Sequence, residues 1–245
     1  MNSNANDDIK IARFIDIDAC KQVFSESYST FLLRSHKYYW HIEDTAKQDK
    51  TEFQVQGENG TMETGYALLN CWTILDGDEP SDEEWKIFKK DSPVVAIVSS
   101  PKKVCDFLYA TLNIKRENGR SHPFFRIERK EVDYKEKVKG KATIQDAIFT
   151  KDKKFEEEKE YRFAVFYSAM FHEINTYIFH AQNPDEYMGK CYFNPSSSGA
   201  EALLNTILSA TAGYGPFDRK KLCDIIANSD IFIDRVKSGY PPVRV

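Results

Sequence analysis

The sequence predicts a single α+β domain, residues 1–245, with a mixed, mostly antiparallel central sheet and flanking helices. Short apolar runs that alternate with polar residues recur along the chain, and this is the pattern of half-buried strands. Between them lie stretches with apolar residues at helical spacing, several preceded by residues that begin helices. With 41% apolar and 13% aromatic residues, the chain can bury a sizeable core, so we expect it to fold.

The chain is predicted to open with a strand and a helix. Residues 9–14 alternate between apolar and polar side chains, as a half-buried strand does. Asp16 or Asp18 then stands where it can cap a helix over residues 18–28. A second short strand is expected at residues 31–35.

The next part of the chain alternates strands with helices. Residues 45–63 are polar and contain glycines, so we expect an exposed excursion there. Strands follow at residues 66–73 and 94–99, where apolar side chains are dense. A short helix is predicted over residues 82–89. Proline at the start and apolar residues at helical spacing predict another over residues 101–113.

The second half of the chain is predicted to supply more strands and two helices. Alternation predicts strands at 124–132, 160–166, 175–179 and 191–195. Residues 150–155 are expected to be a loop or the start of a helix. Serine caps predict a helix over residues 199–210, and a short helix is expected over residues 219–227.

The charge balance and the ends of the chain exclude several classes of protein. The 34 Lys and Arg residues against 38 Asp and Glu argue against general binding to duplex nucleic acid. Five dispersed cysteines without CxxC spacing suggest neither a disulfide framework nor a zinc site. Residues 1–8 are polar and acidic, so we expect a disordered tail. The apolar runs are too short to span a bilayer, which predicts a cytoplasmic protein without a membrane partner.

Common catalytic and cofactor motifs are missing from the sequence. Neither GxGxxG nor GxxxxGK[ST] occurs, and the serine-hydrolase elbow, the HExxH helix and the deaminase signature are also absent. His36 and His41 are five residues apart, which fits no helical pair of ligands. The sequence therefore predicts no metal site.

The most informative segment is residues 158–163, where charged residues stand at the start of an apolar strand. Alternation would place Glu158 and Glu160 on one strand face. In a partly desolvated cleft, Glu160 can stabilise a developing cation or accept a proton, with Glu158 and Arg162 tuning its charge. We therefore predict these three residues to be catalytic. The alternative is a solvated acidic turn with a Glu–Arg surface pair.

A second candidate feature is an aromatic loop that contains Tyr39 and Trp40. Flat aromatic faces can stack on a base or on nicotinamide and exclude water from it. Packing into the core or into a lid is the alternative.

Several segments together resemble a bacterial family known as domain of unknown function 2971. The segments are Arg13–Ile15, Cys71–Thr73, Glu84–Phe88, Val95–Ile97 and Glu158–Phe163. Here Phe88 stands in place of the family's usual tyrosine, and Tyr161 in place of its tryptophan. The resemblance spans most of the chain but implies no activity.

A further similarity is to ADP-ribosyltransferases, which carry a basic residue on the first strand, an aromatic or hydroxyl strand and a late glutamate. Arg13, then Tyr66 or Thr73, then Glu160 occupy that order. The resemblance implies that Arg13 binds the phosphate or ribose of NAD and that Tyr39 or Trp40 stacks on nicotinamide. Glu160 would stabilise the cationic ribose as nicotinamide leaves. Such an enzyme would belong to toxin or phage-defence biology, with a protein or nucleic acid as its target.

Two other functions are compatible with the same residues. A non-catalytic module would use the charged strand start and the aromatic loop to contact a protein or a single-stranded nucleic acid. A metal-dependent nuclease or phosphohydrolase would gather Glu83, Glu84, Glu158 and Glu160 around a divalent ion.

Overall fold

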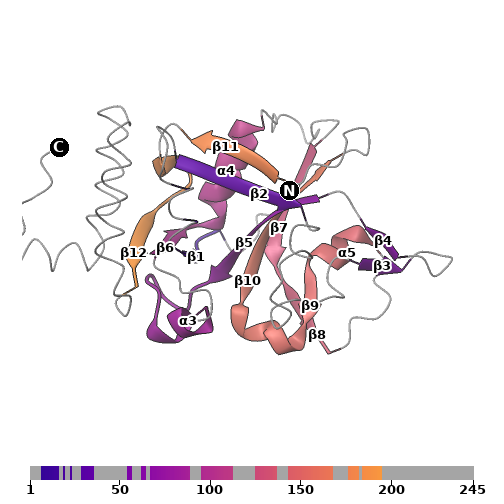
Figure 1. Ribbon diagram of the computed structural model, residues 1–245, viewed down its shortest axis with the longest axis horizontal. Coiled ribbons are helices and arrows are strands. Elements are labelled where there is room, and N and C mark those ends of the chain that lie inside the picture. Colours follow the sequence, from indigo (N-terminus) through magenta and orange to yellow (C-terminus); the bar gives the residue numbers. More distant parts are fainter. Residues whose placement is uncertain are drawn as a thin grey trace, which may run out of the picture. The chain divides into compact units, whose positions relative to one another are not determined.

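The structure of the protein is a computed structural model. It describes residues 7–16, 19, 23, 29–35, 54–56, 62–64, 67–88, 95–112, 125–136, 143–167, 176–181 and 184–194. These residues form mostly strands, in a largely antiparallel sheet with a few helices, which confirms the mixed α and β class (Figure 1). The chain divides into two compact units. The first unit comprises Met1–Phe31, Ile74–Phe107 and Phe179–Val245, and the second comprises Leu32–Thr73 and Leu108–Ile178.

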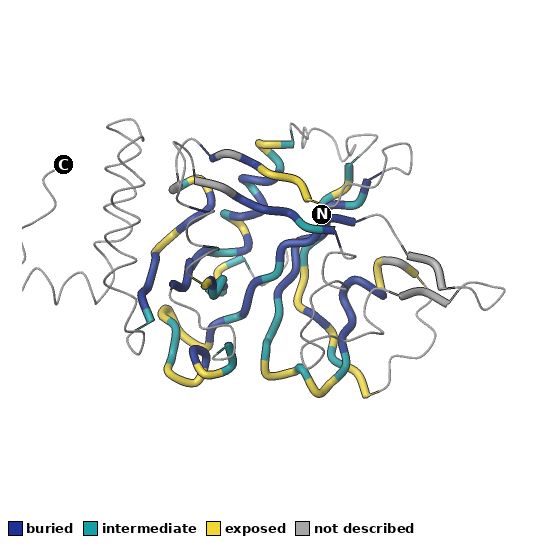
Figure 2. Tube along the Cα trace, viewed as in Figure 1, coloured by how far each residue is buried: buried dark blue, intermediate teal, exposed yellow. Residues whose placement is uncertain are grey.

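In the first unit, β6 (Val95–Ser99) lies between two antiparallel neighbours. It pairs with β1 (Ile11–Ile15) on one side and with β12 (Lys190–Phe193) on the other. Every residue of β6 is buried, as Figure 2 shows by its dark blue trace. A strand with neighbours on both sides and covered faces is expected to be apolar, and residues 95–98 satisfy this requirement, while the buried hydroxyl of Ser99 donates to the carbonyl of Tyr187.

The first unit also contains the capped helix α3 (Asp82–Ile87). Ser81 is its N-cap, and the side chain of Glu84 returns to accept the backbone N–H of Ser81 at 2.7 Å. The other oxygen of Glu84 accepts the N–H of Asp76 at 2.9 Å. These bonds fix the turn before the helix and aim Trp85 into the core, where its ring meets the ring of Phe14 edge-on at 4.9 Å.

Substitution of Ser81 by alanine is expected to lower the free energy of unfolding by about 1 kcal/mol, because the N–H of Glu84 loses its capping oxygen. Urea denaturation of the full chain measures the change. Lys86→Ala, an exposed change in the same helix, is the control and should have a smaller effect. Equal effects of the two substitutions would show that the cap contributes nothing.

The helix α4 (Pro101–Thr111) begins at the proline and has the apolar face that the sequence predicts. Val104 and Phe107 are buried, and the ring of Phe107 packs on Phe31 and Tyr187 at 5.3 and 5.2 Å. Aromatic side chains bury large areas, so these ring contacts stabilise the packing of Phe107 against its neighbours.

The second unit is built on antiparallel strands in the order β2 (Ser29–Ser35), β5 (Ala67–Ile74), β10 (Glu160–Tyr167) and β7 (Phe125–Glu131). β5 and β10 are central and largely buried, whereas β7 pairs with β10 alone among the described strands and carries exposed charged residues. This difference in burial explains why apolar and charged residues alternate along β7, whereas β5 is apolar along most of its length.

A compact segment between β7 and β10 was not fully predicted. It contains β8 (Asp133–Lys135), α5 (Ile144–Ile148), β9 (Thr150–Asp152) and the 3₁₀ helix η3 (Lys153–Glu158). β8 and β9 form a parallel pair, which is a two-stranded sheet separate from the antiparallel strands described above. Residues 150–152 are thus a strand, and residues 153–155 begin a helical turn. The backbone N–H of Asp133 donates to the carbonyl of Phe149 at 2.8 Å and holds the start of β9 beside β8.

The structure also describes parts of the predicted first helix and of the excursion at residues 45–63. Ala19 and Val23 are helical, and the N–H of Ala19 donates to Asp16, as predicted for the first helix. Within the predicted excursion at residues 45–63, β3 (Gln54–Gln56) forms an antiparallel pair with β4 (Met62–Thr64), which extends to residue 64. The strand β11 (Thr176–Ala181) and the turn η4 (Pro184–Glu186) complete the described elements.

The predicted helices at 199–210 and 219–227 lie outside the described residues. Within the described part of the chain, no helix is long and apolar enough to cross a membrane.

Candidate functional site

The candidate site lies in the second unit, at the junction between η3 and β10. Glu158 is the last residue of η3, and the strand begins only at Glu160. Between them Lys159 adopts a left-handed conformation with φ 43° and ψ 48°. The prediction that both glutamates lie on one strand face is therefore wrong, because Glu158 belongs to the 3₁₀ helix and the left-handed Lys159 interrupts the alternation of a strand.

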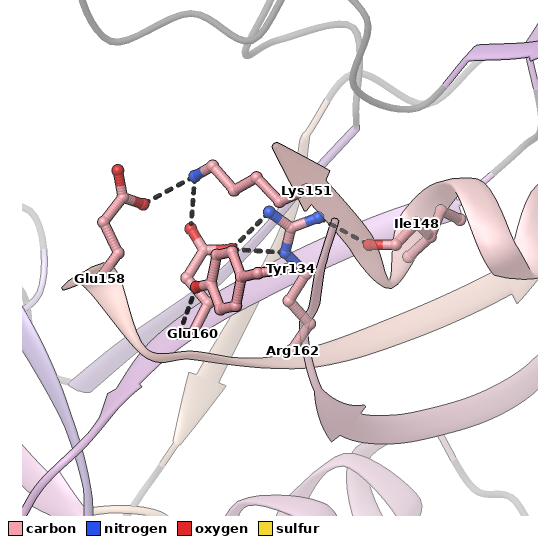
Figure 3. A network of polar contacts seen from close by, with 6 residues as sticks. All are labelled: Tyr134, Ile148, Lys151, Glu158, Glu160 and Arg162. Atoms are coloured by element: carbon pink, nitrogen blue, oxygen red, sulfur yellow. Dashed lines mark hydrogen bonds and ion pairs between the residues drawn. The ribbon is translucent and has the colours of Figure 1, made fainter. Parts of the chain in front are cut away.

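The two carboxylates nevertheless meet on one buried ammonium group. Lys151 of β9 has only 6% of its side chain exposed, and its Nζ donates to Oε2 of Glu158 at 2.6 Å. The same Nζ donates to Oε1 of Glu160 at 3.1 Å, and Figure 3 shows the lysine between the two acids. The ring of Phe155 lies 4.9 Å from the ammonium. A buried charge requires such partners, since an unpaired ammonium in the interior is strongly disfavoured.

Arg162 holds the other oxygen of Glu160. Its Nε donates to Oε2 of Glu160 at 2.6 Å, and a second guanidinium nitrogen pairs with the same oxygen. Its Nη1 donates to the backbone carbonyl of Ile148 at 2.6 Å (Figure 3). Arg162 is fully buried. The guanidinium thus fixes the carboxylate of Glu160 with charge-assisted hydrogen bonds and ties β10 to the end of α5.

Tyr134 of β8 completes the network. Its hydroxyl accepts the backbone N–H of Glu160 at 2.8 Å, at the point where β10 begins. Burial raises the pKa of Tyr134, and the negative charge of Glu160 raises it further, so the phenol stays protonated. Tyr134 therefore anchors the main chain of Glu160 without adding a charge.

The environment gives the two glutamates opposite proton affinities. For Glu158, burial is the largest influence and outweighs the attraction of Lys151, so its pKa rises to about 7. Burial acts in the same direction on Glu160, but Arg162 and Lys151 together prevail and lower its pKa to about 2. Near neutral pH Glu160 therefore stays ionised, whereas Glu158 can bind or release a proton.

The structure places the predicted nucleotide-binding residues as follows. Thr73 of β5 is the direct cross-strand partner of Glu160, and it is buried. Arg13 lies on β1 in the first unit, opposite Ile97 of β6, and is half-buried. Tyr39, Trp40 and Tyr66 lie outside the described residues.

The carboxylates predicted for a metal site have other partners. Both oxygens of Glu84 accept backbone N–H groups, and Glu83 is an exposed residue that faces Lys86 at 3.9 Å. Glu158 and Glu160 are bonded to Lys151 and Arg162. Among the described residues, no cluster of three or more His, Cys, Asp or Glu side chains is arranged to hold a metal ion.

Sequence reasoning found Glu158, Glu160 and Arg162 but missed Lys151 and Tyr134. Both missed residues come from the β8–β9 pair, and neither belongs to a recognisable motif. Comparison with known proteins adds no further assignment, since no family model, curated protein or solved structure matches the chain.

Proposed function

We propose that the chain is a cytoplasmic bacterial enzyme of the ADP-ribosyltransferase type, a single α+β domain that acts on NAD in toxin or phage-defence biology. The observation that supports this is the carboxylate pair. Glu158 and Glu160 share one ammonium group, yet their pKa values are about 7 and about 2. When the surroundings of two carboxyl groups separate their pKa values, one group can transfer protons while the other stays ionised. Here Glu158 would transfer the proton and Glu160 would be the anion.

The chemistry follows from these two roles. Breaking the bond between ribose and nicotinamide leaves positive charge on the ribose, and the permanently ionised Glu160 is suited to stabilise it. A hydroxyl group of the target, or water, then bonds to the ribose carbon, and its proton passes to Glu158. Because its pKa is raised to about 7, Glu158 is suited to accept that proton near neutral pH.

The remaining contacts to NAD are part of the same proposal. Arg13 would bind its phosphate or ribose, and Tyr39 or Trp40 would stack on nicotinamide. Thr73, the alternative to Tyr66 in this order of residues, is buried and lies directly opposite Glu160 in the sheet. We therefore assign the reacting end of the substrate to Glu158 and Glu160, and its recognition to Arg13, to Tyr66 or Thr73, and to the aromatic loop.

The proposal predicts that the purified full chain releases nicotinamide from NAD. Glu160→Gln should lower the rate about a hundredfold or more, because the fixed anion is lost. Glu158→Gln should lower it at least about tenfold, because a proton acceptor is lost. Chromatographic measurement of nicotinamide gives the rates, and urea denaturation confirms that each variant is folded.

Glu157→Gln is the matched control, since Glu157 lies in the same η3 turn and is exposed. It should leave the rate unchanged. Absence of nicotinamide release together with absence of a thermal shift by NAD would exclude the proposed substrate. Activity that survives both Glu158→Gln and Glu160→Gln would exclude the proposed site.

A further inference from the structure

Lys151 differs from the lysines that surround it in sequence. Lys153 is half exposed and pairs with the exposed Glu136 at 3.4 Å, and Lys154 is exposed beside the ring of Phe155. Lys151 alone of these three is buried. Its ammonium contacts both carboxylates of the site, so it lies at the centre of the network (Figure 3).

On the basis of the proposed function, we propose that Lys151 is a positioning residue, whose ammonium holds Glu158 beside Glu160 and keeps the proton acceptor of the reaction ready to ionise. Lys151 itself need not touch the substrate.

The contacts separate this role from that of Arg162. The guanidinium bonds to Glu160 and to the carbonyl of Ile148, whereas the ammonium of Lys151 bonds to Glu158 and to the other oxygen of Glu160. Removing Lys151 would therefore leave Glu160 held by Arg162 and by Tyr134, while Glu158 would lose its ion pair. The two roles can be tested independently.

The direction of the effect follows from the groups that face Glu158. They are Lys151 on β9, Glu160 on β10 and Tyr134 on β8. Tyr134 stays neutral, so the charges that matter are one attractive ammonium and one repulsive carboxylate. Without the ammonium, Glu158 would keep burial, the negative charge of Glu160 and a side-chain hydrogen bond with Glu160, all of which raise its pKa. It would then bind its proton more tightly and lose its activity as a base near neutral pH.

The test is a ¹³C NMR titration of the side-chain carboxyl groups in the full chain. In Lys151→Met, the titration midpoint of Glu158 should rise by about 1 to 2 pH units, and Glu160 should stay ionised across the range. The acid limb of the kcat/KM profile for nicotinamide release should move upward by the same amount. Lys151→Arg keeps the positive charge and should restore the midpoint to within about half a unit of its original value.

Lys154→Met is the matched control, because Lys154 lies over the same Phe155 ring at 4.8 Å and has no recorded bond to either glutamate within the described residues. It should leave the Glu158 midpoint in place. An unchanged midpoint in Lys151→Met would overturn the proposal. A rate that falls without any movement of the pH profile would also overturn it, because that result is what a purely structural residue would give.

A measurement on the unaltered chain covers the case in which Lys151→Met does not fold. The ¹⁵Nζ resonance of Lys151 should shift as Glu158 ionises, with the same midpoint, whereas that of Lys154 should not. A Lys151 resonance that is insensitive to this titration would overturn the proposal. If the Glu158 midpoint moves in Lys151→Met but NAD is never cleaved, the control of Glu158 by Lys151 stands and the proposed substrate fails.

Discussion

Replacement of Arg162 by methionine is expected to lower the free energy of unfolding by about 3 to 5 kcal/mol, the largest effect of any substitution considered. Methionine fills a similar volume but removes the bonds to Glu160 and to the carbonyl of Ile148. Glu160 then keeps Lys151 as its remaining charged partner at 3.1 Å. A buried carboxylate that loses most of its compensation is far more destabilising than the loss of an exposed ion pair.

Urea denaturation of the full chain at neutral pH measures this effect. Arg126→Met is the matched control, since Arg126 lies on the neighbouring strand β7, pairs with Glu128 at 3.1 Å and has 54% of its side chain exposed. Its effect should be much smaller. If the two variants lost similar free energies of unfolding, the buried Glu160–Arg162 pair would stabilise the fold no more than an exposed ion pair does.

The pair can also be tested as a unit. Glu160→Gln removes the negative charge that Arg162 compensates, so the variant that combines it with Arg162→Met should be more stable than the two single effects predict. The expected coupling is about 1 to 3 kcal/mol, as measured for contacting residues in one network. Strict additivity would show that the recorded hydrogen bonds do not couple the two residues.

The sequence predicted the part of this site that depends on strand periodicity. Glu160 and Arg162 are two residues apart on a strand, so their side chains lie on one face, and the structure joins them by direct hydrogen bonds. The strand β10 was predicted from the alternation of its residues, whereas β5 and β6 were predicted from their dense apolar side chains, as expected for strands buried on both faces.

The rest of the site depends on contacts that no local pattern encodes. Glu158 was predicted beside Glu160 for the wrong reason, since the left-handed Lys159 separates helix from strand and the two acids meet instead on the ammonium of Lys151. Lys151 belongs to a run of three lysines within four residues, and its burial depends on the parallel pairing of β8 with β9. Tyr134 reaches Glu160 across 26 residues of sequence. Long-range pairing of this kind cannot be inferred from periodicity alone.

The free energy of unfolding should fall as the pH rises from about 4.5 to about 7, through the ionisation of Glu158. Folding raises the pKa of Glu158 from 4.5 to about 7, so between these values the folded chain holds a proton that the unfolded chain has released. Raising the pH then favours the unfolded state. At about 1.4 kcal/mol for each pKa unit, the loss reaches up to about 3 kcal/mol.

Glu160 acts in the opposite direction and in a different range of pH. Its pKa is lowered from 4.5 to about 2, so between these values the unfolded chain binds more protons than the folded chain does. Stability from Glu160 is therefore complete above about pH 4.5 and is lost as the pH falls toward 2. Together the two residues should give a maximum of stability near pH 4.5.

Urea denaturation at about pH 5 and about pH 8 separates the Glu158 contribution from those of other titrating groups. The loss of stability between the two pH values should be smaller in Glu158→Gln than in the unaltered chain, because glutamine does not ionise. Glu157→Gln should retain the full loss. If Glu158→Gln shows the same loss as the unaltered chain, Glu158 ionises normally in the folded state.

The same result would remove the basis for the proposed role of Glu158, since a glutamate with an ordinary pKa is a much weaker base at neutral pH. The ionisation that destabilises the fold is thus the one that the proposed reaction requires.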